Sequence, residues 1–154
     1  AASDVYKRQG HDIETAWLID RGCKVLDDPE LTQKMYAITG DLTAQIYKVA
    51  FDGHSLANEC DRGVVNVHRV WWVQAETALG FLNAYELTGA STWLRQAEAQ
   101  FAYIRRAFVD PRPNSEWFWS LTESGVPTDK PIVEEWKCPY HNSRMCLRVM
   151  EHLA

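Results

Sequence analysis

The chain has 154 residues, 46% of them hydrophobic, which is enough for one domain with a buried core. Its formal net charge is -5 and it contains no basic cluster, so nucleic acid and anionic membranes are not expected partners. No apolar run reaches the roughly 18 residues of a membrane-spanning helix, and no signal-peptide pattern is present. The four cysteines form no Cys-x-x-Cys pair, which predicts reduced thiols and a cytoplasmic location.

Two helices are predicted in the first third of the chain. Residues 12–26 carry an apolar face, which includes Trp17 as an expected core residue. Asp28 and Pro29 form a typical cap and first-turn pair for a second helix that continues to about Val49. Residues 1–9 show no helical period, and we interpret them as a non-native or disordered leader.

A second helical pair resembles the first. Its first helix opens near Trp71 and is expected to end before Gly89, because glycine is frequent just after the last helical turn. Either Ser91 or Thr92 is a candidate cap for the next helix, whose apolar stripe continues to Phe108.

The helix openings form an internal repeat. His11-Asp-Ile-Glu-Thr-Ala-Trp17 and Trp71-Trp-Val-Gln-Ala-Glu-Thr-Ala-Leu79 share Glu-Thr-Ala at a shift of 62 residues. A third opening lies about one period later, where a last helix is predicted from about Asn142. A repeat of this length indicates stacked supersecondary units, here helical hairpins.

The fold class follows from this repeat. Helical hairpins that start from one end and are joined by long loops predict an all-α fold, either an α/α toroid or an α-solenoid. The long connections, residues 51–70 and 109–135, contain runs that we expect to form short β-hairpin-like strands. Two and a half hairpins cannot close a ring, so residues 10–154 are interpreted as part of a larger barrel.

Two histidines are the candidate catalytic residues. His11 and His141 are predicted to lie immediately before equivalent helices of different units. An imidazole can give and take a proton at neutral pH, so two of them on opposite sides of one carbon could invert it. The alternative is that each histidine only caps a helix.

Carboxylates and tryptophans surround this end of the helices. Glu14 and Glu76 occupy matching repeat positions, where they could cap a helix, orient a histidine or bind sugar hydroxyls. The indoles of Trp71, Trp72 and Trp136 could pack against sugar rings.

Other chemistries find little support in the sequence. One loop contains His54, Cys60 and His68, but their spacing matches no tetrahedral zinc pattern, so no metal site is expected. Phosphate-binding loops and the serine nucleophile elbow are absent from the sequence, and no cofactor is expected.

Five motifs together resemble the cellobiose 2-epimerase branch of the N-acylglucosamine 2-epimerase superfamily. They begin at Gly10, Trp71, Gly80, Glu116 and Trp136, in the family's order and with similar spacing over residues 10–153. The last motif, Trp136-Lys-Cys-Pro-Tyr-His-Asn-Ser-Arg144, is the most specific of the five.

The resemblance implies a fold and a function. The expected fold is an (α/α)6 barrel, with residues 10–154 as its C-terminal part and the N-terminal half of the same barrel missing. The implied reaction is reversible inversion of C2 at the reducing-end glucose of a β-1,4-linked disaccharide through a cis-enediol. The implied proton carriers are His11 and His141, and the implied substrate contacts are Glu14, Trp71, Trp72, Glu76 and Trp136. The chain alone is expected to be inactive.

Several alternatives remain open at this stage. An aldose–ketose isomerase or a mannose 2-epimerase would use the same scaffold. An α/α-barrel glycoside hydrolase would use Glu14 and Glu76 as its paired carboxylates. A non-catalytic carbohydrate-binding repeat protein would need the tryptophans but not two histidines.

Overall fold

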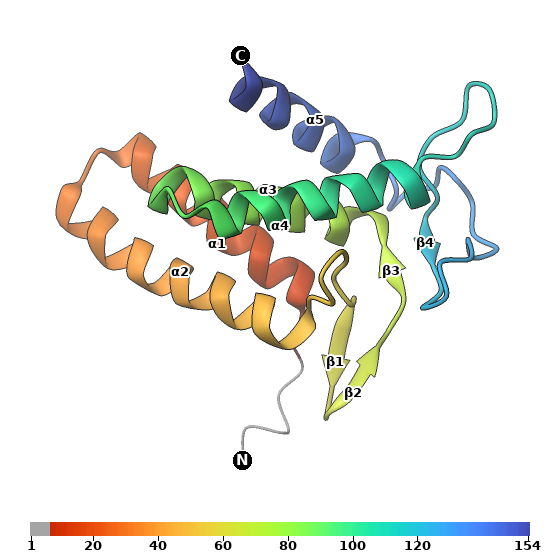
Figure 1. Ribbon diagram of the computed structural model, residues 1–154, viewed down its shortest axis with the longest axis horizontal. Coiled ribbons are helices and arrows are strands. Elements are labelled where there is room, and N and C mark those ends of the chain that lie inside the picture. Colours follow the sequence, from red (N-terminus) through yellow and green to blue (C-terminus); the bar gives the residue numbers. More distant parts are fainter. Residues whose placement is uncertain (1–6) are drawn as a thin grey trace.

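The computed structural model describes residues 7–154, and helices dominate this part (Figure 1). The described residues form five α-helices, one π-helix and four short strands that lie in the connections between helices. Their bounds are α1 Gln9–Leu26, α2 Pro29–Ala50, α3 Trp71–Thr88, α4 Ser91–Tyr103 and α5 Tyr140–Leu153, with the π-helix at Ile104–Phe108 directly after α4.

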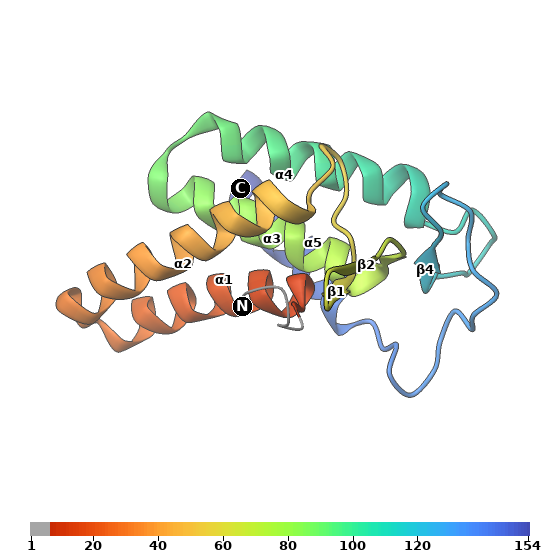
Figure 2. The same ribbon diagram turned by 90° about the horizontal axis from the view of Figure 1, so that it is seen from below.

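The predicted repeat is visible in the arrangement of the helices. α1 and α3 begin at Gln9 and Trp71, which preserves the shift of 62 residues. α1 and α2 form one antiparallel hairpin, and α3 and α4 form the next (Figures 1 and 2). The helices α1, α3 and α5 all begin at the end of the molecule where the long loops lie.

The helix ends confirm two of the expected signals and contradict one. The Asp28 carboxylate accepts a hydrogen bond from the backbone N–H of Leu31 at 3.0 Å, and Gly89 ends α3 with a φ of 67°. The expected cap at Ser91 or Thr92 is wrong, because α4 begins after Ala90 without a side-chain cap. Both hydroxyls accept hydrogen bonds from Arg95 instead.

Two helices begin earlier than the sequence pattern indicated. α1 starts at Gln9 rather than Asp12, and α5 starts at Tyr140 rather than Asn142. Both histidines therefore lie inside the first helical turn and not before it. The rings of His11 and His141 pack against Trp72 of α3, so these residues do not follow the apolar period of their own helices.

The expected leader is only partly within the described residues. Residues 1–6 lie outside them. For residues 7–9 the structure differs from a disordered segment, because Lys7 exchanges two backbone hydrogen bonds with Cys60 and Gln9 is buried.

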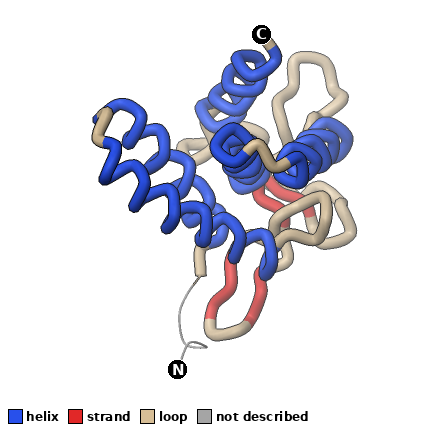
Figure 3. Tube along the Cα trace, turned by 60° about the vertical axis from the view of Figure 1, so that its left-hand side comes forward, coloured by secondary structure: helices blue, strands red, loops and turns tan. Residues whose placement is uncertain are grey.

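The predicted strand-like runs form two small antiparallel pairs (Figure 3). β1 (Glu59–Asp61) pairs with β2 (Val64–Asn66) across a tight turn in which Arg62 and Gly63 have positive φ. β3 (Arg69–Val70) pairs with β4 (Ser120–Leu121) and so joins the two long connections. β3 leads directly into the tryptophan pair that opens α3.

α3 is the central helix, and it packs against α1, α4 and α5. It is buried on nearly every side from Trp71 to Ala84. Its contact with α1 is close because position 80 is a glycine: a Cβ at Gly80 would lie 2.3 Å from Cγ1 of Ile13. Ile13 itself is completely buried, so it has little room to move.

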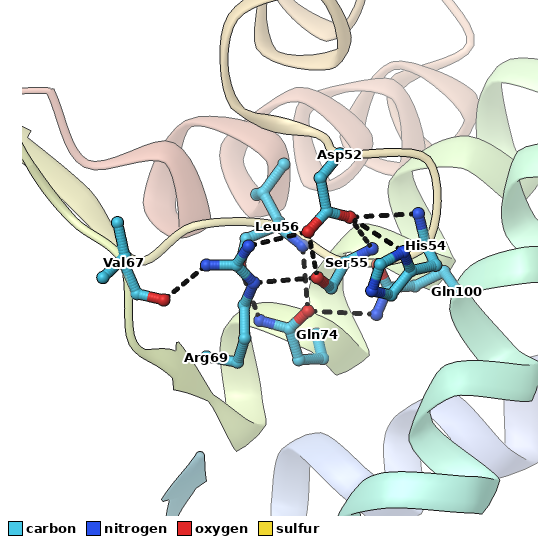
Figure 4. A network of polar contacts seen from close by, with 8 residues as sticks. All are labelled: Asp52, His54, Ser55, Leu56, Val67, Arg69, Gln74 and Gln100. Carbon is cyan, nitrogen blue, oxygen red and sulfur yellow. Dashed lines mark hydrogen bonds and ion pairs between the residues drawn. The ribbon is translucent and has the colours of Figure 1, made fainter. Parts of the chain in front are cut away.

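A buried polar network fastens the loop before α3 to the helices (Figure 4). The side-chain amide of Gln74 donates a hydrogen bond to the backbone carbonyl of Leu56 and accepts one from its backbone N–H. The same amide oxygen also accepts a hydrogen bond from the side chain of Gln100 in α4. Asp52 accepts from the Ser55 hydroxyl and forms an ion pair of 2.7 Å with Arg69. These contacts fix the path of the chain into Trp71.

Within residues 7–154, none of the helices combines the length and apolar character that crossing a bilayer requires.

The α1–α3 contact gives a test of packing. Gly80→Ala should lower the free energy of unfolding by about 1–3 kcal/mol, because the added methyl group overpacks against Ile13. The control is Gly40→Ala in α2, where a Cβ meets nothing within 4 Å and alanine should stabilise by up to about 1 kcal/mol. Urea denaturation of both variants measures the difference. Equal effects in the two variants would contradict the close packing.

The Asp52 network predicts a pH dependence of stability. Burial raises the pKa of the Asp52 carboxyl, but hydrogen bonds from Arg69, Ser55 and two backbone N–H groups outweigh it and lower the pKa from 3.8 to about 2. A depressed carboxyl pKa stabilises the fold above pH 3.8 and loses that contribution as the pH falls to about 2.

Asp52→Asn should therefore cost about 1 kcal/mol at pH 7, a value discounted because the side chain is one-third exposed, and much less at pH 2.5. Denaturation curves at both pH values measure this difference. A penalty that is the same at the two pH values would contradict an electrostatic role.

Candidate active site

The first turns of α1, α3 and α5 meet at one end of the molecule and bring three pairs of side chains together. These pairs are His11 and Glu14 from α1, Trp72 and Glu76 from α3, and His141 and Arg144 from α5. Members of each pair are three or four residues apart, so they lie on one face of their helix.

The centre of the cluster is the carboxylate of Glu76, which is completely buried. Its Oε1 lies 2.6 Å from Nδ1 of His141. Because a carboxylate only accepts hydrogen bonds, this contact assigns the proton to Nδ1 and leaves the lone pair on Nε2 of His141. That tautomer is the one a general base needs.

Arg144 completes the surroundings of Glu76. One terminal guanidinium nitrogen donates to Oε1 of Glu14 at 2.6 Å and to Oε1 of Glu76 at 2.7 Å. The guanidinium carbon lies 5.0 Å from the ring centroids of both Trp17 and Tyr140, which is within cation–π range. Burial lowers the pKa of Arg144, but the bonds to the two carboxylates outweigh this and raise it, so the side chain stays charged.

The remaining oxygen of Glu76 is also occupied. Nε1 of Trp17 donates to Oε2 of Glu76 at 2.9 Å. The Glu76 carboxylate therefore binds His141, Arg144 and Trp17, and α3 has no side-chain cap. Of the roles considered for Glu76, helix capping is wrong and orientation of a histidine agrees with these contacts.

Trp72 lies between the two histidines. Its indole is 4.7 Å from the His11 ring centroid and 5.4 Å from that of His141. His11 is exposed, whereas His141 is buried. The close approach of α1 to Trp72 depends on Gly10, where a Cβ would lie 2.7 Å from the indole.

The other two tryptophans have different surroundings. Trp71 is buried against Trp119, and its ring also faces Nζ of Lys137 at 5.5 Å. Trp136 lies in the loop before α5 and is 79% exposed, away from the cluster of contacts described above. The structure therefore brings Trp72 to both histidines, whereas the buried Trp71 has a more distant edge contact with His141, at 6.5 Å between ring centroids.

The start of α5 is anchored by a second buried group. Glu116 forms an ion pair with Lys137 and accepts a hydrogen bond from Asn142, the residue after His141. Lys137 is 1% exposed, and burial lowers the pKa of its ammonium group to about 8. The contact ties the loop of residues 109–121 to the helix that carries His141.

Sequence reasoning did not single out Arg144, Tyr140 or the polar role of Trp17. A signal was available for Arg144, because it lies three residues after His141 and so shares its helix face. Trp17 similarly lies three residues after Glu14. The ring of Tyr140 packs 3.8 Å from that of His141, a contact that no helical period predicts.

The cluster contains atoms that could ligate a metal. Donor atoms of Glu14, Glu76 and His141 lie within 4.8 Å of one another, the one such group in residues 7–154. The guanidinium of Arg144 already bonds both carboxylates and takes the place of a cation between them. In the same part of the chain His54, Cys60 and His68 form no such group.

Known proteins of one family resemble this chain. The N-acylglucosamine 2-epimerase family (GlcNAc 2-epimerase) matches residues 5–144. A cellobiose 2-epimerase of Eubacterium cellulosolvens is 50% identical over 142 residues, which are 92% of this chain and 35% of that protein. The chain thus spans about a third of the length of the curated relatives it matches.

Solved structures show the same fold. The crystal structure of a sugar epimerase from a ruminal bacterium matches with a TM-score of 0.93 and 38% identity, covering 97% of this chain and 39% of that one. A D-mannose isomerase, 21% identical, matches with a TM-score of 0.82 over 94% of this chain and 37% of its own, and supports the fold alone. The expected all-α fold, a partial (α/α)6 barrel, is confirmed. With a family match over most of its length, the chain belongs to the N-acylglucosamine 2-epimerase family.

Proposed function

We propose that this chain forms the catalytic part of a sugar 2-epimerase that acts on the reducing-end glucose of cellobiose-like β-1,4-linked disaccharides. The observation that carries the proposal is the 2.6 Å contact between Nδ1 of His141 and the buried Glu76 carboxylate, which orients the imidazole and leaves Nε2 for a substrate proton. The second histidine, His11, contacts the same indole, that of Trp72.

The reaction removes a proton from one face of C2 and adds a proton to the opposite face. The sugar ring opens to the aldehyde, and one imidazole takes the C2 proton while the aldehyde oxygen gains a proton, which leaves a cis-enediol that gives up this oxygen-bound proton when C2 is reprotonated. The other imidazole returns a proton to the opposite face of C2, and the ring closes on the mannose unit. No electron leaves the sugar, so the reaction needs no redox cofactor.

The surrounding residues support this reaction in different ways. Glu76 acts through His141, because its two oxygens are taken up by protein donors and it stabilises the imidazolium formed on proton transfer. Glu14 is a candidate contact for sugar hydroxyls. Trp72 and the exposed Trp136 offer aromatic surface to sugar rings, and Trp71 packs in the core against Trp119.

We also propose that residues 10–154 form the C-terminal part of the barrel and need the rest of it for activity. Support comes from the length comparison and from α5, which packs on α3 while Leu147, Met150 and Leu153 are more than half exposed. Large apolar side chains on a helix of a barrel are normally covered by its neighbours.

The central experiment uses the complete protein that carries this chain, incubated with cellobiose in D2O. Epimerisation through C2 should give a mannose-containing disaccharide, with deuterium at C2 of both epimers. His11→Asn and His141→Asn should each lower kcat/KM by at least about 100-fold. The variant that carries both substitutions should also incorporate no deuterium at C2.

Other products would identify the alternatives. A ketose would show an aldose–ketose isomerase. Free glucose would show a glycoside hydrolase. The geometry disfavours hydrolysis, because Glu14 and Glu76 bind the same nitrogen of Arg144 and neither is placed to act across a glycosidic bond.

The position of Trp72 gives a further prediction. Gly10→Ala should lower kcat/KM by about 10- to 100-fold, because the new methyl group displaces the indole between the histidines. Gly22→Ala in the same helix is the matched control, since a Cβ there meets nothing within 4 Å. Steady-state kinetics on cellobiose compare the two, and equal activity would contradict a role for Trp72 placement.

A further inference from the structure

The charged side chains around His141 carry a net negative charge, and Arg144 is the positively charged one among them. Two carboxylates, Glu14 and Glu76, meet one guanidinium, so the cluster presents about one unit of negative charge to the imidazole. We propose that Arg144 is a positioning residue that sets the pH range of the His141–Glu76 pair by neutralising the second carboxylate. The inference rests on the proposed epimerase function.

The physical argument starts from the demands on a general base. A base must be unprotonated before it takes the C2 proton, yet its protonated form must be stabilised afterwards. Two uncompensated carboxylates would favour the protonated imidazole too strongly, because a nearby opposite charge stabilises the charged form. With Arg144 in place, one negative charge remains, which matches one imidazolium.

The geometry shows that Arg144 acts on both carboxylates together. A single terminal nitrogen bonds Glu14 and Glu76 and lies 3.5 Å from Nδ1 of His141. Since Nδ1 donates to Glu76, the guanidinium faces it without a hydrogen bond and its charge acts through space. Stacking against Trp17 and Tyr140 holds the guanidinium plane in this position.

The other titratable groups near His141 leave this charge count unchanged. Burial raises the pKa of the Tyr140 hydroxyl, which keeps it neutral at the pH of the experiment. Lys137 is paired with Glu116 behind Trp71. Other titratable groups on the first turn of α1 and the loop before α5, among them His11, Asp12 and Cys138, are the same in all the variants compared below.

The test is the pH profile of kcat/KM for cellobiose, measured on the complete protein. Arg144→Met leaves two negative charges, so the acid limb should move to higher pH by about 1–2 units. Glu14→Gln removes one negative charge and should move the same limb to lower pH. The double variant Arg144→Met/Glu14→Gln restores one net negative charge and should return the limb toward its original position.

Arg144→Lys separates charge from geometry. Lysine keeps the positive charge but cannot stack between two rings or present a planar guanidinium, so the limb should stay in place while kcat falls. The proposal is overturned if the acid limb of the kcat/KM profile stays in place in Arg144→Met. It is also overturned if the limb moves to higher pH in Glu14→Gln. A uniform loss of activity at every pH points to a purely structural residue and overturns it as well.

An NMR titration makes the result independent of turnover. The imidazole 13Cε1 signal of His141, assigned with His141→Asn, should titrate at higher pH in Arg144→Met and at lower pH in Glu14→Gln. If the unmodified protein incorporates no deuterium at C2, the proposed function fails, while the titration still tests the role of Arg144. If deuterium enters but the curves do not move, only the role of Arg144 fails.

Discussion

A buried carboxylate is the constraint on which this structure depends. Glu76 lies in the second turn of the central helix, fully out of water, and an unpaired charge there would be too costly for a folded protein. Its partners come from the two neighbouring inner helices, Trp17 from α1 and His141 with Arg144 from α5. The same contacts therefore hold three helices together and orient the proposed base, so folding and site assembly are one event.

The repeat explains how residues so far apart in sequence reach this carboxylate. Each inner helix begins at the same end of the molecule, and each long loop is fastened by its own polar contacts. Gln74 fastens the loop before α3, and Glu116 binds Lys137 and Asn142 at the start of α5. Gln74, Lys137 and Asn142 lie within a few residues of a site residue, which limits how far the first turns can shift. Precision at the site thus comes from loop anchoring as much as from helix packing.

The sequence predicted the architecture better than it predicted the contacts. The 62-residue repeat and the apolar periods identified both hairpins, because these signals are local and regular. Arg144 was missed as a site residue, since its partners lie 68 and 130 residues away and no spacing rule connects them. The role of Glu76 stayed ambiguous for a similar reason: capping, sugar binding and pairing with histidine all place a glutamate in the same helical turn.

The tandem tryptophans show why some roles cannot be separated in a sequence. Consecutive helical residues project about 100° apart, so two neighbours can face different environments. Trp71 turns into the core, where it packs on Trp119 and receives the buried lysine from the opposite side. Trp72 turns toward the histidines and contacts both. One residue supports the site and the other lines it, and because both are the same amino acid, only their surroundings in the fold distinguish them.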